Sequence, residues 1–251
     1  MDTINNFSGR AEDYTAGRPV YANAFIERLY SYYGFSDKSI IADIGSGTGK
    51  FAKQLLARGS FVYCVEPNDD MRNTAIKELG RYKKFSPVCG TAAETTLTDR
   101  SVDFITTAQA FHWFDVGLFK KECKRILKEN GTVFLIWNMR DMSNVINCKC
   151  CEIYSKYCPR FKGFGGGIQK DDVRIKQFFD SKYEYIEFDN PLYYDKHTFI
   201  SRSLSGSYSL KEDDENFKEY LDALSQLFIK SADKEVLTMS NKTVVYFGKI
   251  R

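Results

Sequence analysis

The chain has 251 residues, a formal net charge of +3, and hydrophobic and charged shares of 43% and 27%. These values are ordinary for a globular protein that can bury one sizeable core without disulfide bonds or metal. The near balance of charge, with no basic stripe, argues against nucleic acid or an acidic membrane as the partner. No apolar stretch approaches the ~18 residues of a transmembrane helix, and the first residues lack a signal-peptide pattern, so we expect a cytoplasmic protein.

Strand and helix patterns alternate from residue 39 to residue 138. Short apolar runs rich in β-branched residues predict strands at 39–45, 61–66, 85–90, 101–109 and 132–138. Apolar residues at helical spacing predict helices at 48–59, 68–80 and 116–131, with Asn68 and Asp115 as N-caps. This alternation is typical of a parallel sheet with helices on both faces, in which ligands bind at the carboxyl ends of the strands.

Beyond residue 138 the pattern is less regular. The runs YEYIEF and TVVYFGKI predict two closing strands at 183–190 and 243–250. Between them, the segment DDENFKEYLDALSQLFIKSA carries its apolar residues on one face, which predicts a helix.

Four of the seven cysteines crowd together at Cys148, Cys150, Cys151 and Cys158. Cys148 and Cys151 have the spacing of a zinc-ligand pair, but no second pair and no nearby histidine completes a site. In a protein without an export signal, cysteines are expected to be reduced thiols. The pattern therefore favours a helix with small buried thiols over a metal site.

A glycine-rich stretch, ADIGSGTGKF, follows the first predicted strand. Gly45, Gly47 and Gly49 stand two apart, and glycines at a strand-to-helix turn let the backbone approach a ligand closely. The dinucleotide fingerprint would need glycine at position 50, which is lysine. The P-loop would need glycine and a hydroxyl residue where Ile44 and Phe51 stand. Both common phosphate-binding motifs are therefore excluded.

Two acidic residues accompany this loop. Glu66 ends the second strand, where a carboxylate can accept hydrogen bonds from both hydroxyls of a ribose. Asp43, two residues before the first glycine, could attract a positively charged group. A simple tight turn and a solvated strand end are the alternatives. The combination favours a nucleoside ligand that carries no phosphate.

Several motifs in order along the chain resemble a known family. DIGSGTG, VEPN and CGTAAETTLTDRSVDF are similar to the class I S-adenosylmethionine-dependent methyltransferases. FSGRAEDYTAGRPVY near the start and AQAFHWFD at 108–115 resemble the small-molecule branch related to trans-aconitate methyltransferase. The resemblance covers residues 5–140 and thins beyond them. It implies an α/β fold with a doubly wound, mostly parallel seven-stranded sheet, an N-terminal flap and an insertion after the fifth strand.

The resemblance also implies how one methyltransferase domain over residues 1–251 is organised. The expected parts are an N-terminal flap at 1–38, a cofactor-binding core at 39–138, acceptor-side cap elements at 139–182 and 191–235, and the closing strands at 183–190 and 243–250. The expected cofactor is S-adenosyl-L-methionine. The expected partners are a small-molecule acceptor, with no nucleic acid and no membrane, and the chain is expected to be a monomer or a homodimer.

Roles at matching positions follow from the same resemblance. The methionine part of the cofactor is expected on the glycine loop, and the ribose hydroxyls on Glu66. Thr91 stands at the position where relatives often have an aspartate that binds the adenine amino group. Arg18, in the flap, is expected to pair with the methionine carboxylate or with a substrate carboxylate. The expected cofactor-binding residues are Tyr14, Arg18, Asp43, Gly45, Ser46, Gly47, Thr48, Gly49, Glu66, Pro67, Asn68, Met71, Thr91, Ala92, Gln109 and Ala110.

The acceptor side is less determined by the sequence. AQAFHWFD follows the fourth strand, so it should lie on the rim where cofactor and acceptor meet. His112 is the candidate catalytic residue, with orientation of an acceptor and capping of the strand end as alternatives. The expected acceptor-side residues are Phe111, His112, Trp113, Trp137 and Tyr208, although each aromatic residue could equally serve packing.

Methyl transfer by this family needs orientation more than covalent help. We expect methylation of a small molecule at oxygen, on a carboxylate, which needs no base, or on a hydroxyl, which His112 could deprotonate. The Asn/Asp-Pro-Pro-Tyr/Phe stretch that marks methylation of nucleic acid bases is absent after the fourth strand. The alternative function is a cofactor-binding protein that does not catalyse and acts through a protein partner.

Overall fold

The computed structural model describes residues 19–164, 168, 172–206 and 208–250. Its main sheet has seven strands in the order β3-β2-β1-β4-β5-β9-β6. The strands are β1 (Ile40–Ile44), β2 (Phe61–Val65), β3 (Phe85–Val88), β4 (Val102–Ala108), β5 (Leu127–Arg140), β6 (Glu184–Asp189) and β9 (Asn241–Gly248). The first five pair in parallel, and β9 runs antiparallel to both β5 and β6. The predicted fold class is confirmed, including the two closing strands.

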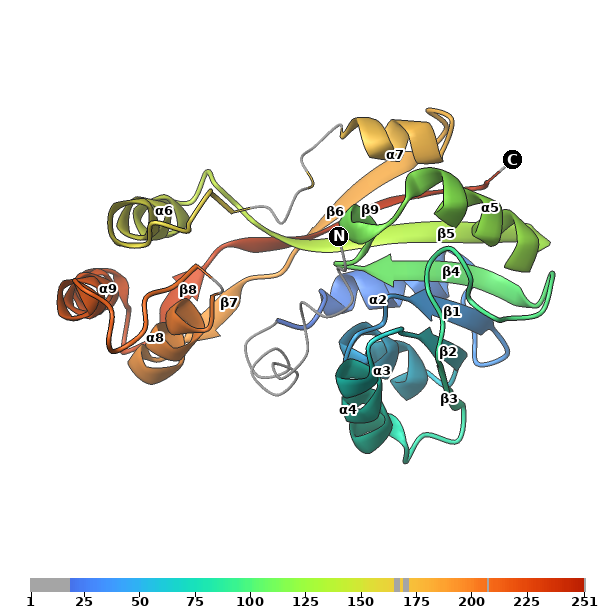
Figure 1. Ribbon diagram of the computed structural model, residues 1–251, viewed down its shortest axis with the longest axis horizontal. Coiled ribbons are helices and arrows are strands. Elements are labelled where there is room, and N and C mark those ends of the chain that lie inside the picture. The colour runs from blue at the N-terminus through green and yellow to red at the C-terminus, as the bar shows by residue number, and fades with distance from the viewer. Residues whose placement is uncertain (1–18, 165–167, 169–171, 207, 251) are drawn as a thin grey trace.

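Helices cover both faces of this sheet (Figure 1). On one face lie α5 (Val116–Ile126) and α7 (Val173–Phe178), which pack Phe119, Ile126 and Phe178 into a shared core. On the other face lie α2 (Asn23–Ser31), α3 (Lys50–Ala57) and α4 (Asp69–Leu79). The central strands are buried on both sides, which is why they read as nearly continuous apolar runs in the sequence.

Helix α2 was not expected from the sequence, because its residues fell within the range assigned to the N-terminal flap. Phe25, Ile26 and Leu29 form its buried face, and Phe25 stacks on Phe51 of α3 with ring centroids 6.2 Å apart. The i, i+1, i+4 spacing of these three apolar residues was the available signal.

The predicted end of the helix after β4 was wrong by a few residues. Asp115 is its N-cap as predicted, and its carboxylate accepts from the Leu118 N–H at 2.8 Å. The helix ends at Ile126, however, and not at Asn130-Gly131. Leu127 instead pairs with Val102 in the sheet, and the register shifts before Thr132 pairs with Phe104. Burial of Leu127 in the core favours the strand over another helical turn.

A second lobe lies beyond the ends of β5 and β9 (Figure 1). It consists of α6 (Val145–Tyr157), α8 (Lys196–Leu204), α9 (Phe217–Ser231) and a two-stranded sheet of β7 (Leu192–Tyr194) and β8 (Leu237–Met239). The lobe has its own core, in which Tyr220, Leu224 and Phe228 of α9 face α6 and α8. The predicted helix at 213–232 is therefore confirmed, and the insertion after the fifth strand begins with α6.

The cysteine cluster lies on α6 and just after it. Cys150 and Cys158 are buried in the core of the second lobe, whereas Cys148 and Cys151 are partly exposed. Among the described residues, no three His, Cys, Asp or Glu side chains converge as a metal site would require. No helix in the same part of the chain is both long and apolar enough to cross a bilayer.

Candidate functional site

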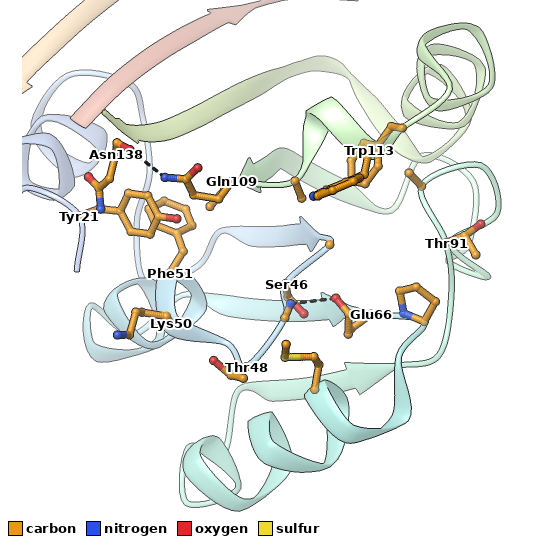
Figure 2. A pocket seen from close by; sticks show the side chains of 18 of the residues that line it. Tyr21, Ser46, Thr48, Lys50, Phe51, Glu66, Thr91, Gln109, Trp113 and Asn138 are labelled. Atoms are coloured by element: carbon orange, nitrogen blue, oxygen red, sulfur yellow. Dashed lines mark hydrogen bonds between the residues drawn. The ribbon is translucent and has the colours of Figure 1, made fainter. Parts of the chain in front are cut away.

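A cavity of about 280 Å³ opens at the carboxyl ends of β1, β2 and β4 (Figure 2). The residues that line it come from the glycine loop, from the ends of β2 and β4, and from the segments that follow β3 and β4. They are Pro19, Tyr21, Gly45, Ser46, Gly47, Thr48, Lys50, Phe51, Glu66, Pro67, Met71, Thr91, Ala92, Ala93, Ala108, Gln109, Ala110, Trp113, Phe114, Asp115 and Asn138. Twelve of the residues predicted from the sequence are therefore brought together around one cavity.

The glycine loop presents backbone, not side chains, to this cavity. Gly47 has a positive φ of 56°, and a Cβ built on it meets no atom within 4 Å, so the space above it is open. Gly49 plays a different part: it begins α3, and a Cβ there would stand 2.4 Å from Cδ1 of Leu79. Gly49 therefore allows α3 and α4 to pack, while Gly47 leaves room for a ligand.

Glu66 holds the loop in this conformation. Its two carboxylate oxygens accept from the backbone N–H groups of Gly47, at 2.9 Å, and Asn68, at 3.0 Å. The side chain is 8% exposed and lies on the cavity wall (Figure 2). Burial raises the pKa of Glu66, and the two backbone hydrogen bonds oppose that rise. Each oxygen retains a lone pair, so the carboxylate can still accept from two ligand hydroxyls.

Asp43 lies beneath the loop and does not line the cavity. Its side chain is 1% exposed and accepts from the Thr106 hydroxyl at 2.8 Å. Burial raises its pKa from 3.8 to about 7, a rise that the Thr106 hydrogen bond opposes and the nearby charge of Glu66 increases. Asp43 can therefore act on a bound cation only through its charge and not by direct contact across the cavity wall.

We expect Asp43→Asn to stabilise the ligand-free protein above neutral pH. The pKa of Asp43 in the folded protein lies above its unfolded value of 3.8. The loss of stability from burying the charged carboxylate is therefore complete above a pH of about 7 and absent below pH 3.8. Asparagine keeps the acceptor for Thr106 without the charge. Thermal unfolding should show a Tm several degrees higher than wild type in alkaline buffer and a smaller difference in mildly acidic buffer. A Tm shift that is equal at both pH values would contradict this assignment.

Residues after β2 and β3 form the second wall of the cavity. The Asn68 side chain caps α4 by accepting from the Met71 N–H at 3.0 Å, so it faces the helix and not the cavity. Pro67, Met71, Thr91 and Ala92 line the wall and provide a mainly apolar surface. A surface of this kind suits the faces of a flat ring system.

The stretch AQAFHWFD forms a turn and a short helix, η2 (Phe111–Trp113), directly after β4. Trp113 lines the cavity and is 46% exposed. Phe111 points the opposite way, into the core, where it packs edge-to-face on Phe178. His112 is partly buried outside the lining of the cavity, its ring 4.9 Å from that of Trp113, and its carbonyl accepts from Arg174.

The backbone of Gln109 adopts an unusual conformation at the cavity rim. Its φ of 59° is in the left-handed region, which costs a residue other than glycine about 1–2 kcal/mol. The Gln109 side chain donates to the carbonyl of Asn138 at 2.9 Å (Figure 2). The Gln109 backbone N–H donates to the Ile136 carbonyl. These bonds maintain the strained turn, which directs the chain after β4 around the cavity.

Sequence reasoning missed the wall formed by Asn138 and the chain before α2. The Asn138 amide donates to the carbonyls of Pro19 and Val20, and its oxygen accepts from Thr243 at 2.7 Å. Tyr21 packs edge-to-face on Phe51, with ring centroids 5.0 Å apart. An asparagine at the end of a strand predicted to be apolar was the available signal.

Asp43, Gly49, Asn68 and His112 lie outside the cavity lining, as do three further predicted positions, and two predicted positions fall outside the described residues. The structure places Phe111 and Trp137 in the sheet core, since Trp137 is buried against Phe111 and Tyr246. Tyr208 lies in the second lobe, against Tyr154 and Phe161. Tyr14 and Arg18 lie outside the described residues.

Residues 42–135 match the family described as a methyltransferase domain. This part of the chain is similar to a methyltransferase domain. The match runs from β1 into β5 and so includes the glycine loop, Glu66 and the AQAFHWFD turn. The domain match and the shared fold indicate that this part of the chain has a methyltransferase fold.

Curated relatives share this part of the chain. An uncharacterized methyltransferase-like protein of Schizosaccharomyces pombe is 32% identical over 139 residues, which are 55% of this chain and 53% of that protein. An uncharacterized methyltransferase of Mycobacterium bovis is 34% identical over 140 residues, 56% of this chain and 55% of that protein. The chain thus spans about half the length of the curated relatives it matches.

Solved structures share the fold over most of the chain. A candidate type II methyltransferase from Anaeromyxobacter dehalogenans superposes with a TM-score of 0.65 at 16% identity, covering 93% of this chain and 98% of that one. A candidate methyltransferase from an antibiotic biosynthesis pathway of Anabaena variabilis gives a TM-score of 0.64 at 20% identity, covering 92% and 98%. These likenesses establish the methyltransferase fold.

Proposed function

We propose that the chain transfers a methyl group from S-adenosylmethionine to a small molecule, at a carboxylate or hydroxyl oxygen. The observation that carries the proposal is the pairing of Gly47 and Glu66 at one cavity. Open space above Gly47 admits a ligand against the backbone, and the Glu66 carboxylate beside it can accept from ribose hydroxyls. These residues fit a nucleoside whose ribose bears no phosphate.

The other residues around the cavity fit the remaining parts of the cofactor. Met71, Ala92 and Trp113 would hold the adenine ring between apolar surfaces. The loop from Gly45 to Thr48 would hold the methionine part, with the negative charge of Asp43 beneath it. Tyr14 and Arg18 would complete the site from the N-terminal flap, as the family resemblance implies.

The reaction requires orientation above all. When bound, the sulfonium of the cofactor supplies an activated methyl group. The chain's own residues hold the acceptor oxygen in line with that group and exclude water, which can contribute about 7–11 kcal/mol. Gln109 and Asn138 are joined by a hydrogen bond and form the part of the cavity rim from which an acceptor would approach. A carboxylate acceptor would need no general base, in keeping with the position of His112 outside the cavity lining.

We expect His112→Gln to change kcat/KM by less than about tenfold, because general-base catalysis typically contributes a factor of about 100–10,000. The His112 side chain lies outside the cavity lining, and glutamine is a polar side chain of similar size that does not titrate. Steady-state kinetics across neutral pH would test this. A loss of 100-fold or more, together with loss of an ionisation in the kcat/KM profile, would make His112 the catalytic base.

A direct test combines cofactor binding with turnover. Calorimetry should show saturable binding of S-adenosylhomocysteine, and a methyl-release assay on a panel of small carboxylic acids and phenols should identify an acceptor. Failure to bind the cofactor would refute the proposal. Binding without turnover on any acceptor would favour the alternative, a non-catalytic protein that acts through a protein partner.

A further inference from the structure

Residues 19–22 form a short segment that leads into α2 and contributes to the cavity wall. Pro19 and Tyr21 line the cavity, and the Tyr21 ring lies edge-to-face on Phe51 of α3. The segment belongs to no helix or strand. Its backbone N–H and carbonyl groups therefore need partners outside regular secondary structure, and those partners determine where the segment lies.

Gln54 of α3 holds the backbone of Tyr21 by two hydrogen bonds. The amide oxygen of Gln54 accepts from the Tyr21 N–H at 3.1 Å, and its amide nitrogen donates to the Tyr21 carbonyl at 2.9 Å. Gln54 itself does not line the cavity. It therefore fixes a residue of the cavity wall from behind, without being able to touch a ligand.

Side chains from the other end of the sheet hold the rest of the segment in a closed network. Asn190, between β6 and β7, donates to the Val20 carbonyl at 2.8 Å and to the Asn138 side-chain oxygen at 3.1 Å. Thr243 of β9 accepts from the Ala22 N–H at 2.9 Å and donates to the same Asn138 oxygen at 2.7 Å. Neither Asn190 nor Thr243 lines the cavity. Both amide hydrogens of Asn190 thus have acceptors, which fixes the orientation of the network.

The segment lies at one end of the cavity (Figure 2). Tyr21 and Asn138 gather at this end, whereas Glu66, Trp113 and Thr91 lie toward the other. The proposed cofactor has its ribose on Glu66 and its adenine ring against Trp113. Its methionine part therefore extends toward the end of the cavity that the segment closes.

We propose that Gln54 and Asn190 are positioning residues that hold the 19–22 segment against the methionine part of the cofactor. This inference rests on the proposed function and adds two residues that act on the ligand only through the segment. A wall that is fixed before the ligand arrives costs less to order on binding than a loose one. Because the adenosine part is bound at the other end, the two residues should matter only for ligands that reach the segment.

The test compares two ligands that share the adenosine part. S-adenosylhomocysteine carries the amino-acid part, and 5′-methylthioadenosine lacks it. In calorimetry on the full chain, Gln54→Ala and Asn190→Ala should each weaken S-adenosylhomocysteine binding about tenfold, and change methylthioadenosine binding by less than about twofold. Retained binding of methylthioadenosine also shows that the variants are folded.

Asn190→Asp separates hydrogen bonding from packing. The variant keeps the shape of the side chain, but it turns a carboxylate oxygen toward the Val20 carbonyl and the Asn138 oxygen, which are both acceptors. We expect a selective loss of S-adenosylhomocysteine affinity at least as large as in Asn190→Ala. Wild-type affinity of Asn190→Asp for S-adenosylhomocysteine would show that these hydrogen bonds do not position the segment.

Gln226→Ala is the matched control for Gln54→Ala. Gln226 is an exposed glutamine of α9 in the second lobe, outside the cavity lining, so both affinities should stay within about twofold of wild type. Equal weakening of both ligands by Gln54→Ala and Asn190→Ala, or no weakening of either, would overturn the positioning role alone. A wild-type protein that binds neither ligand would instead refute the methyltransferase proposal, and this inference with it.

Discussion

Replacing Gly47 with arginine is expected to abolish binding of S-adenosylhomocysteine, with a loss of affinity of at least about 1000-fold. A Cβ on Gly47 meets no protein atom within 4 Å, so the arginine side chain would extend into the cavity itself. It would occupy the space beside Glu66 and pair with that carboxylate in place of ribose hydroxyls. Calorimetry at saturating ligand, with thermal unfolding to verify the fold, measures this effect.

Gly163→Arg is a matched control for the backbone. Gly163 also has a positive φ, of 97°, and a Cβ on it also meets nothing within 4 Å. It lies in the second lobe, beyond the residues that line the cavity. Both variants carry the same penalty for a side chain at positive φ, so the difference between them isolates the blocked cavity. Normal cofactor binding by Gly47→Arg would remove the glycine loop from the site.

Much of the sheet could be predicted from local patterns. Strands β1, β2 and β4 are largely buried on both faces, so most of their residues are apolar. Such runs can be recognised without knowing which face of the sheet each residue occupies. The caps Asn68 and Asp115 were recognisable because a cap acts within three residues of its own position. The glycine loop and Glu66 were recognisable for a similar reason, because their spacing and their position at strand ends are properties of the linear chain.

The rest of the site depends on contacts between distant segments. Asn138 lines the cavity because it joins the chain before α2 to β9 through hydrogen bonds that span more than 100 residues. Trp137 precedes it by one residue and therefore points to the opposite face, into the core. Strand boundaries alone do not show which of two neighbours faces a cavity.

Glu66→Gln is expected to weaken S-adenosylhomocysteine binding at least about 100-fold, because it disturbs both the glycine loop and the contacts to the ribose hydroxyls. The wild-type carboxylate accepts from two backbone N–H groups, one on each oxygen. Glutamine has a single oxygen, so its NH2 group must face either the Gly47 or the Asn68 N–H, and one buried donor loses its partner. The ribose then meets a weaker acceptor on a displaced loop.

Glu94→Gln makes the same chemical change at an exposed position outside the cavity lining and separates these effects from a general loss of charge. Glu94 is exposed in the turn after β3, where its backbone bonds to Thr91. Its substitution should change the affinity by less than about twofold, since exposed charges contribute little. Equal affinity in Glu66→Gln and Glu94→Gln would show that Glu66 does not bind the ribose. A ligand that lacks the 2′- and 3′-hydroxyls separates the two effects. If Glu66 acted only on the ribose, wild type and Glu66→Gln would bind this ligand equally well. Because the Gly47 N–H also donates to Glu66, we expect the variant to bind it more weakly than wild type does.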